Sequence, residues 1–224
     1  MFQLTPFITC VVFLLLLLVS LSTPIIKGIF FLRLSAASSS TLLNSSARNS
    51  VTFGVWGYCA SGEDIRIFGI NHDAAKNCSG RHLGYTFDDT LQTTLGVSGF
   101  EGKSVSKALT ASLSLHPIAA VLTFILFLIS LFILRRNNHV ALQSLSLIQF
   151  GIGILAAIIT TIALLVDCIV VDAARRTISG HIVTVTWGNA VWMTLVAAIL
   201  LWAVNLEAMT RILTRRQRHD AALR

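Results

Sequence analysis

The chain has 224 residues, of which 54% are hydrophobic and only 12% are charged, and its formal net charge is +7. A soluble domain carries about 25% charged residues, so this composition is typical of a membrane protein. The basic residues flank apolar runs, which favours membrane topology and anionic lipid over nucleic acid as the reason for the charge. No phosphate-binding loop, zinc-ligand spacing or nucleophile motif occurs in the sequence, so we expect neither an enzyme nor a cofactor.

Four apolar runs predict four membrane-spanning helices. The first span is expected within 1–26, after a short cytoplasmic start, because its apolar part is long enough to cross about 30 Å of hydrocarbon. A cleaved signal peptide is the alternative. The run lacks a basic start and a small-residue cleavage site, so we expect it to be retained. The other three spans are expected at 116–134, 142–171 and 187–206.

The segments between the spans predict the orientation of the chain. They are a long loop at 27–115, a basic turn at 135–141, a short polar loop at 172–186 and a basic tail at 207–224. Two arginines in the turn and five in the tail make seven on one side, against two in the polar loop. Because short cytoplasmic loops are enriched in Lys and Arg, both termini are predicted to be cytoplasmic and the long loop external.

The external loop contains two of the four cysteines, Cys59 and Cys78, while the other two lie inside apolar runs. A disulfide between Cys59 and Cys78 is predicted, because an external loop is exposed to oxidising conditions. It would close a loop of about twenty residues, a constraint that contributes roughly 3 kcal/mol in the chain-entropy model.

Around the cysteines, three runs rich in β-forming residues, at 51–58, 65–70 and 81–87, predict a small antiparallel sheet. The serine-rich stretch at 35–50 predicts a flexible surface segment instead. A helix at 104–115 is expected to lead into the second span. The predicted fold is therefore an all-α four-helix membrane bundle with a small, disulfide-linked external β domain.

Two glycosylation sequons lie in the external loop, at Asn44 and at Asn77. Asn44 lies in the accessible serine-rich tract, whereas Asn77 is adjacent to Cys78 and its expected disulfide. We therefore predict that Asn44 is the preferred site.

A few ionisable residues are candidates for function. Asp167 lies near the outer end of the third span, where it has either a structural or interfacial role or a polar contact with a partner helix or arginine. His72, His82, His116 and His181 are expected on the outer side. Histidine titrates near neutral pH, but ordinary surface or boundary histidines are favoured over direct pH sensing.

Small residues recur four apart on the last two spans and predict close helix packing, because small side chains let helices approach closely in lipid. Packing within the four-helix bundle is favoured, and an interface with a partner protein is the alternative. The positions are Gly153, Ala157 and Thr161 on the third span, and Ala190, Thr194 and Ala198 on the fourth.

Several motifs, in this order and spacing, resemble the fungal pali-type four-span membrane proteins, within the wider group of eisosome-associated proteins. These are STPIIKGI at 22–29, GVWGYC at 54–59, CSGRHLGY at 78–85, HPIAA at 116–120, LVD at 165–167 and WG at 187–188. The architecture is also similar to that of claudins. The resemblance covers nearly the whole chain, and its most specific residues in the external loop are Gly54, Trp56, Gly57, Tyr58, Gly84 and Tyr85.

The resemblance implies a plasma-membrane component of fungal ambient-pH signalling, which supports a seven-span sensor at the cell surface. The alternative is a claudin-like or eisosome-type organiser of membrane domains or cell contact, with no role in pH response. The expected partners are the lipid bilayer and a membrane protein, either the sensor or a cortical scaffold. No nucleic acid is expected to bind.

Overall fold

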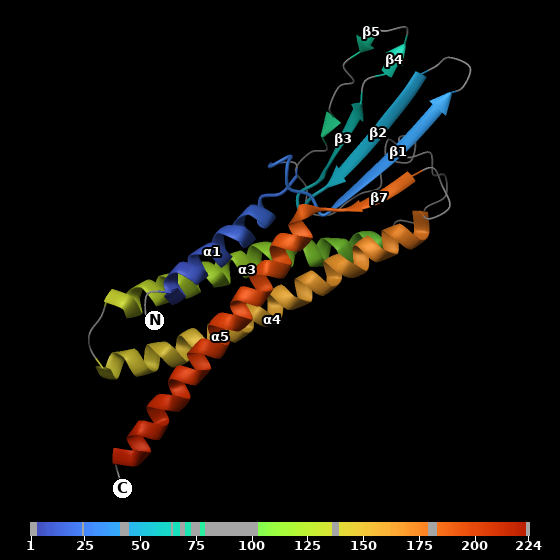
Figure 1. The fold of residues 1–224 in the computed structure, drawn as a ribbon. Coiled ribbons are helices and arrows are strands. Elements are labelled where there is room, and N and C mark those ends of the chain that lie inside the picture. The colour runs from blue at the N-terminus through green and yellow to red at the C-terminus, as the bar shows by residue number, and fades with distance from the viewer. Residues whose placement is uncertain are drawn as a thin grey trace. The chain divides into compact units, whose positions relative to one another are not determined.

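The structure of the protein is a computed structural model (Figure 1). It describes residues 4–23, 25–40, 45–63, 65–67, 70–72, 77–78, 103–135, 139–178 and 183–222. The chain consists of two compact units. The helical unit comprises Met1–Leu17, Leu115–Ala163 and Met193–Arg224. The sheet unit comprises Leu18–Ser114 and Leu164–Trp192.

Four helices contribute to the helical unit: α1 (Leu4–Ser20), α3 (Lys103–Arg135), α4 (His139–Ile178) and α5 (Asn189–Ala222). Among the residues that the structure describes, three apolar stretches are long enough to cross a membrane, at Ser114–Arg135, Leu145–Arg176 and Asn189–Thr214. The apolar helix α1 has 17 residues, which is the lower end of the length range of membrane-spanning helices. Three to four of the helices are therefore suited to a bilayer.

The core of the helical unit is built mainly from small side chains contributed by all four helices. Alanine predominates in it, and the larger members come from α1, α3 and α5. Large apolar side chains point outward instead; Val121, Ile158 and Ile199 are all exposed. This arrangement suits lipid, because close backbone approach replaces hydrophobic exclusion as the packing force. The buried core residues are Val12, Leu16, Ala119, Ala120, Leu126, Ala156, Ala157, Ala197 and Leu201.

The sheet unit contains a five-stranded antiparallel sheet with the strand order β6-β3-β2-β1-β7. Its strands are β1 (Leu32–Ser40), β2 (Ser45–Phe53), β3 (Tyr58–Glu63), β6 (Asn77–Cys78) and β7 (Val183–Trp187). A separate two-stranded sheet pairs β4 (Ile65–Ile67) with β5 (Ile70–His72). Figure 1 shows β7, from the connection between α4 and α5, lying beside β1.

The register of β1 explains which face of the sheet is covered. Leu34 pairs with Val51 of β2 and with Val185 of β7, and both Leu34 and Val51 are buried. Arg33, one residue earlier, is exposed. Because side chains alternate between the two faces of a strand, this pattern places apolar residues on one face and polar residues on the other.

The structure differs from the sequence-based expectations in three segments. The stretch at 35–50, expected to be flexible, contributes most of β1 and the start of β2, because the antiparallel ladder between them is anchored by apolar pairs at its base. The connection at 172–186, expected to be a loop, contains the end of α4 and most of β7. Pro117, at the expected start of the second span at 116–134, lies inside α3.

His116 also differs from the expectation of an outward or boundary histidine, because it is fully buried. It lies on the same helical face as Ala119, Ala120 and Thr123, which are buried as well. Residues spaced three or four apart share one face of a helix, so this face of α3 is the buried one. His72 lies in β5, whereas His82, His181 and the predicted strand at 81–87 lie outside the described residues.

Candidate functional site

The turn that follows α1 is closed by hydrogen bonds from Thr23 to Ile29. The backbone N–H of Thr23 donates to the carbonyl oxygen of Ile29 at 3.0 Å, and the Thr23 hydroxyl donates to the same oxygen at 2.8 Å. The N–H of Ile29 in turn donates to the carbonyl of Ile26. Ser22 and Thr23 are completely buried. The STPIIKGI motif thus forms a turn that is held by hydrogen bonds from Thr23 and Ile29.

The GVWG segment lies directly against this turn. The N–H of Val55 donates to the Ser22 hydroxyl oxygen at 2.8 Å, and the Trp56 indole N–H donates to the carbonyl of Ser20 at 2.7 Å. A β-carbon placed on Gly54 would lie 2.3 Å from the carbonyl oxygen of Thr23. Only glycine therefore permits the two backbones to approach this closely.

Gly57 closes the GVWG segment on itself. Its carbonyl oxygen accepts a hydrogen bond from the N–H of Gly54 at 2.9 Å, and its φ angle is 152°. Residues with a side chain rarely adopt this backbone conformation. The second glycine of the motif thus sets the direction in which the chain enters β3.

A third segment, Gly188 to Ala190, packs against the other end of the same turn. The N–H of Gly188 donates to the carbonyl of Phe31 at 2.8 Å, and a β-carbon on Gly188 would lie 1.8 Å from the carbonyl oxygen of Phe30. The Asn189 side chain accepts from the N–H of Phe30 and donates to the carbonyl of Gly28. We call residues 20–31, 54–57 and 188–190 together the motif junction.

The motif junction is built mainly from backbone contacts and has few charged side chains. Lys27 is its charged side chain, and it is exposed. Within the part of the chain that the structure describes, no group of three or more His, Cys, Asp or Glu side chains is arranged to hold a metal ion. The hydrogen bonds of the motif junction can hold the sheet in one geometry.

The predicted disulfide between Cys59 and Cys78 is present, with an S–S distance of 2.05 Å. The two cysteines lie opposite each other, Cys59 in β3 and Cys78 in β6. Beside them, the rings of Tyr58 and Phe53 are 6.0 Å apart. The disulfide thus attaches the two-residue edge strand β6 to the sheet. The motif residues Gly84 and Tyr85 lie outside the described residues.

Comparison with known proteins decides the family. Residues 2–204 match the model of the SUR7/PalI family. This chain belongs to the SUR7/PalI family. It is similar to the pH-response regulator protein palI/RIM9 of Pyricularia oryzae, with 31% identity over 208 residues. The match covers 91% of this chain and 23% of that protein, so the chain spans less than a quarter of the relative's length. All three segments of the motif junction lie within the residues that match the family.

The small-residue stripes of this SUR7/PalI chain are directed mostly inward. Five of the six predicted positions are buried, and Thr161 is partly buried, with its hydroxyl accepting from the Trp202 indole N–H at 3.2 Å. Gly153 lies against Asn205, whose side-chain oxygen would be 2.4 Å from a β-carbon on the glycine. This burial favours packing within the chain over an interface with a partner. The buried positions are Gly153, Ala157, Ala190, Thr194 and Ala198.

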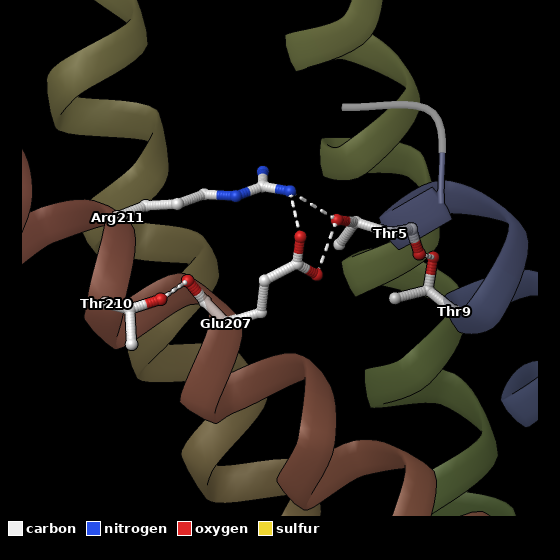
Figure 2. A network of polar contacts seen from close by, with 5 residues as sticks. All are labelled: Thr5, Thr9, Glu207, Thr210 and Arg211. Atoms are coloured by element: carbon white, nitrogen blue, oxygen red, sulfur yellow. Dashed lines mark hydrogen bonds and ion pairs between the residues drawn. The ribbon is translucent and has the colours of Figure 1, made fainter. Parts of the chain in front are cut away.

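A polar network joins α1 to α5 within the helical unit, as Figure 2 shows. Arg211 forms an ion pair with Glu207 and donates to the Thr5 hydroxyl at 2.9 Å, and Thr5 donates to Glu207 at 3.1 Å. The Thr9 hydroxyl bonds back to the carbonyl of Thr5 within α1. The two charged side chains are each 30% exposed.

Sequence reasoning missed this network because the fourth span was predicted to end at residue 206, which assigned Glu207 and Arg211 to a tail. The available signal was their spacing of four residues, which allows a Glu–Arg pair on one face of a helix. Thr5, their partner on α1, lies about two hundred residues away in sequence and carried no signal of its own.

Asp167 is buried on α4, with 5% of its surface exposed. Further along α4, Asp172 and Arg176 form an exposed ion pair at 2.8 Å, and the Arg175 guanidinium lies 6.0 Å from the centre of the Trp187 ring. The end of α4 in the sheet unit therefore combines a buried carboxylate with exposed charges and an aromatic ring.

Proposed function

We propose that this protein is a plasma-membrane accessory component of fungal ambient (alkaline) pH signalling, which supports the localisation or stability of a seven-span sensor. The observation that carries the proposal is the match of 91% of this chain to a protein named as a pH-response regulator, within a shared family. The chain spans less than a quarter of that relative, so the proposal concerns only the role of the segment that the two proteins share.

We also propose a claudin-like arrangement with four spans, both termini in the cytoplasm and the segment 27–115 outside the cell. The three long apolar helices and the shorter α1 support an even number of spans. The Cys59–Cys78 disulfide supports an external sheet, because disulfides persist in oxidising compartments. The arginines of the turn at 135–141 and of the tail support the orientation.

In this proposal the protein acts by contact. The motif junction holds the five-stranded sheet in one geometry through backbone hydrogen bonds, and that sheet presents the recognition surface. The helical stripes, whose positions are mostly buried, stabilise the protein itself. The sheet therefore provides most of the contact with a partner, and the helical bundle contributes to the stability of the protein.

Deletion in the native fungus, followed by growth at alkaline pH and imaging of the sensor, tests the proposal. Loss of growth and of sensor at the cell surface is expected, with rescue by the wild-type gene and by Gly28→Ala. Gly188→Ala, which disrupts the motif junction, should fail to rescue. Normal growth and normal sensor localisation in the deletion strain would reject a role in pH response.

The second candidate is a claudin-like or eisosome-type organiser of membrane domains or cell contact. It is favoured by the family itself, which groups SUR7 with PalI, and by the presence of a five-stranded antiparallel sheet in the chain. Co-purification from fungal membranes distinguishes the two candidates. Recovery of a seven-span protein supports the first, and recovery of cortical scaffold proteins without it supports the second.

An N-linked glycan at Asn44 belongs to the same proposed arrangement. Asn44 lies outside the described residues, while Asn77 is the first residue of β6, next to the disulfide. Asn44→Gln should increase gel mobility, and Asn77→Gln should leave it unchanged. The reverse pattern would show that the other sequon is used.

A further inference from the structure

The end of α4 brings charged side chains and a tryptophan together within the sheet unit. The Arg175 guanidinium lies 6.0 Å from the centre of the Trp187 ring of β7, a distance that allows a cation–π contact. The next residue, Arg176, pairs with Asp172 at 2.8 Å. All four side chains are exposed, and they carry two positive charges and one negative charge, a net charge of +1. We call Asp172, Arg175, Arg176 and Trp187 the arginine–tryptophan cluster.

The contact with Trp187 leaves Arg175 able to bind an anion. Arginine meets an aromatic ring with the face of its guanidinium, whereas its five N–H donors lie in the plane of that group. Within the described part of the chain, no carboxylate pairs with Arg175, since Asp172 is bound to Arg176 and Glu207 to Arg211. Arg175 is therefore the side chain of the cluster that is best placed to bind a further negative group.

The position of the cluster along α4 corresponds to the head-group layer of a bilayer. The exposed side chains that precede it are apolar, with Leu165 57% and Ile169 65% exposed. Asp172 is the first exposed charge after them, because Asp167 is buried. Arg175 follows Asp172 by three residues, about 4.5 Å along the helix axis. The head-group layer is roughly 5–7 Å thick on each side of the hydrocarbon, so a membrane-crossing α4 places Arg175 within it.

Two exposed tryptophans flank the entry into α5. Trp187 is the last residue of β7 and is 37% exposed, and Trp192 lies in the first turn of α5 and is 61% exposed. Tryptophan is enriched where a membrane meets water, because its ring is apolar and its indole N–H is polar. The connection between α4 and α5 thus combines exposed arginines with exposed tryptophans, as expected of a segment at a membrane surface.

We propose that the arginine–tryptophan cluster binds the phosphate of a membrane lipid head group, in the leaflet where α4 leaves the membrane. Arg175 is the principal donor, because a guanidinium can donate two parallel N–H groups to phosphate oxygens. The net charge of +1 attracts the phosphate, and Asp172 limits that attraction. The proposal requires α4 to cross a membrane and does not depend on a role in pH response.

The test uses the full-length protein labelled with 5-fluorotryptophan, in dodecyl maltoside, a detergent without phosphate. Fluorine NMR follows the four tryptophans separately, and the signal that is lost in Trp187→Phe belongs to Trp187. Titration with phosphatidylglycerol should shift this signal until it saturates. The apparent affinity should fall as salt is raised, because exposed charges are screened.

Two further ligands separate the lipid from its parts. Diacylglycerol has acyl chains but no phosphate, and it should give no saturable shift of the Trp187 signal. Glycerol phosphate has the phosphate but no acyl chains, and it should bind much more weakly than the lipid. An equal response to glycerol phosphate would show a site for free phosphate instead. No response to phosphatidylglycerol would overturn the proposal and favour an acidic segment of a protein partner.

Three variants locate the site. R175Q should weaken the binding of phosphatidylglycerol roughly fivefold, the loss expected for one arginine near a membrane surface. D172N should strengthen it, because the negative charge of the cluster is removed. R135Q removes an exposed arginine at the end of α3 and should leave the titration unchanged. The signals of the other tryptophans check that each variant keeps its fold. Weaker binding in D172N, or an equal loss in R175Q and R135Q, would contradict the assignment.

Discussion

The sheet unit and the helical unit are each stabilised internally by a different kind of contact. In the sheet unit, three segments distant in sequence meet through backbone hydrogen bonds, and at Gly54 and Gly188 there is no room for a single methyl group. In the helical unit, many small side chains pack along helix faces, and alanine predominates in the core. The backbone contacts of the sheet unit require particular residues. The packing of the helical unit requires only that small residues recur along a helix face.

This difference explains where the family motifs lie. A backbone contact such as that between Gly54 and Thr23 tolerates one residue type, so it leaves a readable motif. A helix face built from alanine, glycine and threonine can be composed in many ways, provided that the side chains stay small. Three of the six motifs, STPIIKGI, GVWGYC and WG, accordingly meet at the motif junction, whereas the small residues of the bundle form a periodic pattern.

The largest effect is expected from Gly188→Ala. The added β-carbon would lie 1.8 Å from the carbonyl oxygen of Phe30, and main-chain atoms on both sides would have to move. We expect a loss of more than about 4 kcal/mol in stability of the sheet unit, which is beyond the usual range for a single substitution. Thermal unfolding of the purified protein in detergent measures this loss.

Gly28→Ala is the matched control, because no atom lies within 4 Å of a β-carbon at Gly28. It should change stability by less than about 0.5 kcal/mol. If the two variants unfold at the same temperature, the close backbone contact at Gly188 does not hold the sheet unit together.

Cys59→Ser should have the next largest effect, about 3 kcal/mol, because it releases the loop that the disulfide closes. Susceptibility of the sheet to limited proteolysis measures the effect. Cys10→Ser, which changes a free cysteine in α1, should leave the proteolysis pattern unchanged. Detection of Cys59 and Cys78 as free thiols in the mature protein, by non-reducing mass mapping, would remove the basis of this prediction.

Gly153→Ala tests the helical unit, and its effect should be smaller, about 1–2 kcal/mol. The obstructing atom belongs to the Asn205 side chain, which can shift at the cost of its hydrogen bond to the carbonyl of Leu201. Gly151→Ala, where a β-carbon would have open space, should be neutral or slightly stabilising.

Asn205→Ala sharpens this test, because it removes the obstruction and should reduce the cost of Gly153→Ala. A double-mutant cycle in thermal unfolding measures the coupling between the two positions. Strictly additive effects would show that the two side chains do not share one packing site.

Trp56→Phe should have the smallest effect, about 1 kcal/mol. It keeps an aromatic ring but removes the indole N–H that donates to the carbonyl of Ser20 at 2.7 Å. Trp192→Phe, at an exposed ring, serves as the control in the same unfolding assay. A larger cost at Trp192 would place the stabilising role of the tryptophans at the exposed start of α5 and not at the motif junction.

Several features of the fold could be predicted from local sequence. The three long apolar helices follow from runs whose length matches a bilayer, and the Cys59–Cys78 disulfide follows from the only cysteines outside those runs. Gly54, Trp56 and Gly57 were recognisable as motif residues from the family resemblance. What they contact was not recognisable, because a contact between distant segments has no local signature.

The sequence by itself determined the class of the protein, its apolar helices, its disulfide and its family, because each of these depends on composition, periodicity or a short motif. Only the tertiary structure decided that the serine-rich stretch contributes most of β1 and the start of β2, and that the connection before α5 supplies β7. It also decided that Thr5 meets Glu207 and Arg211. The physical reason is that strand pairing and buried polar contacts are satisfied by partners far along the chain, so the residues involved look like loop or tail until the partner is in place.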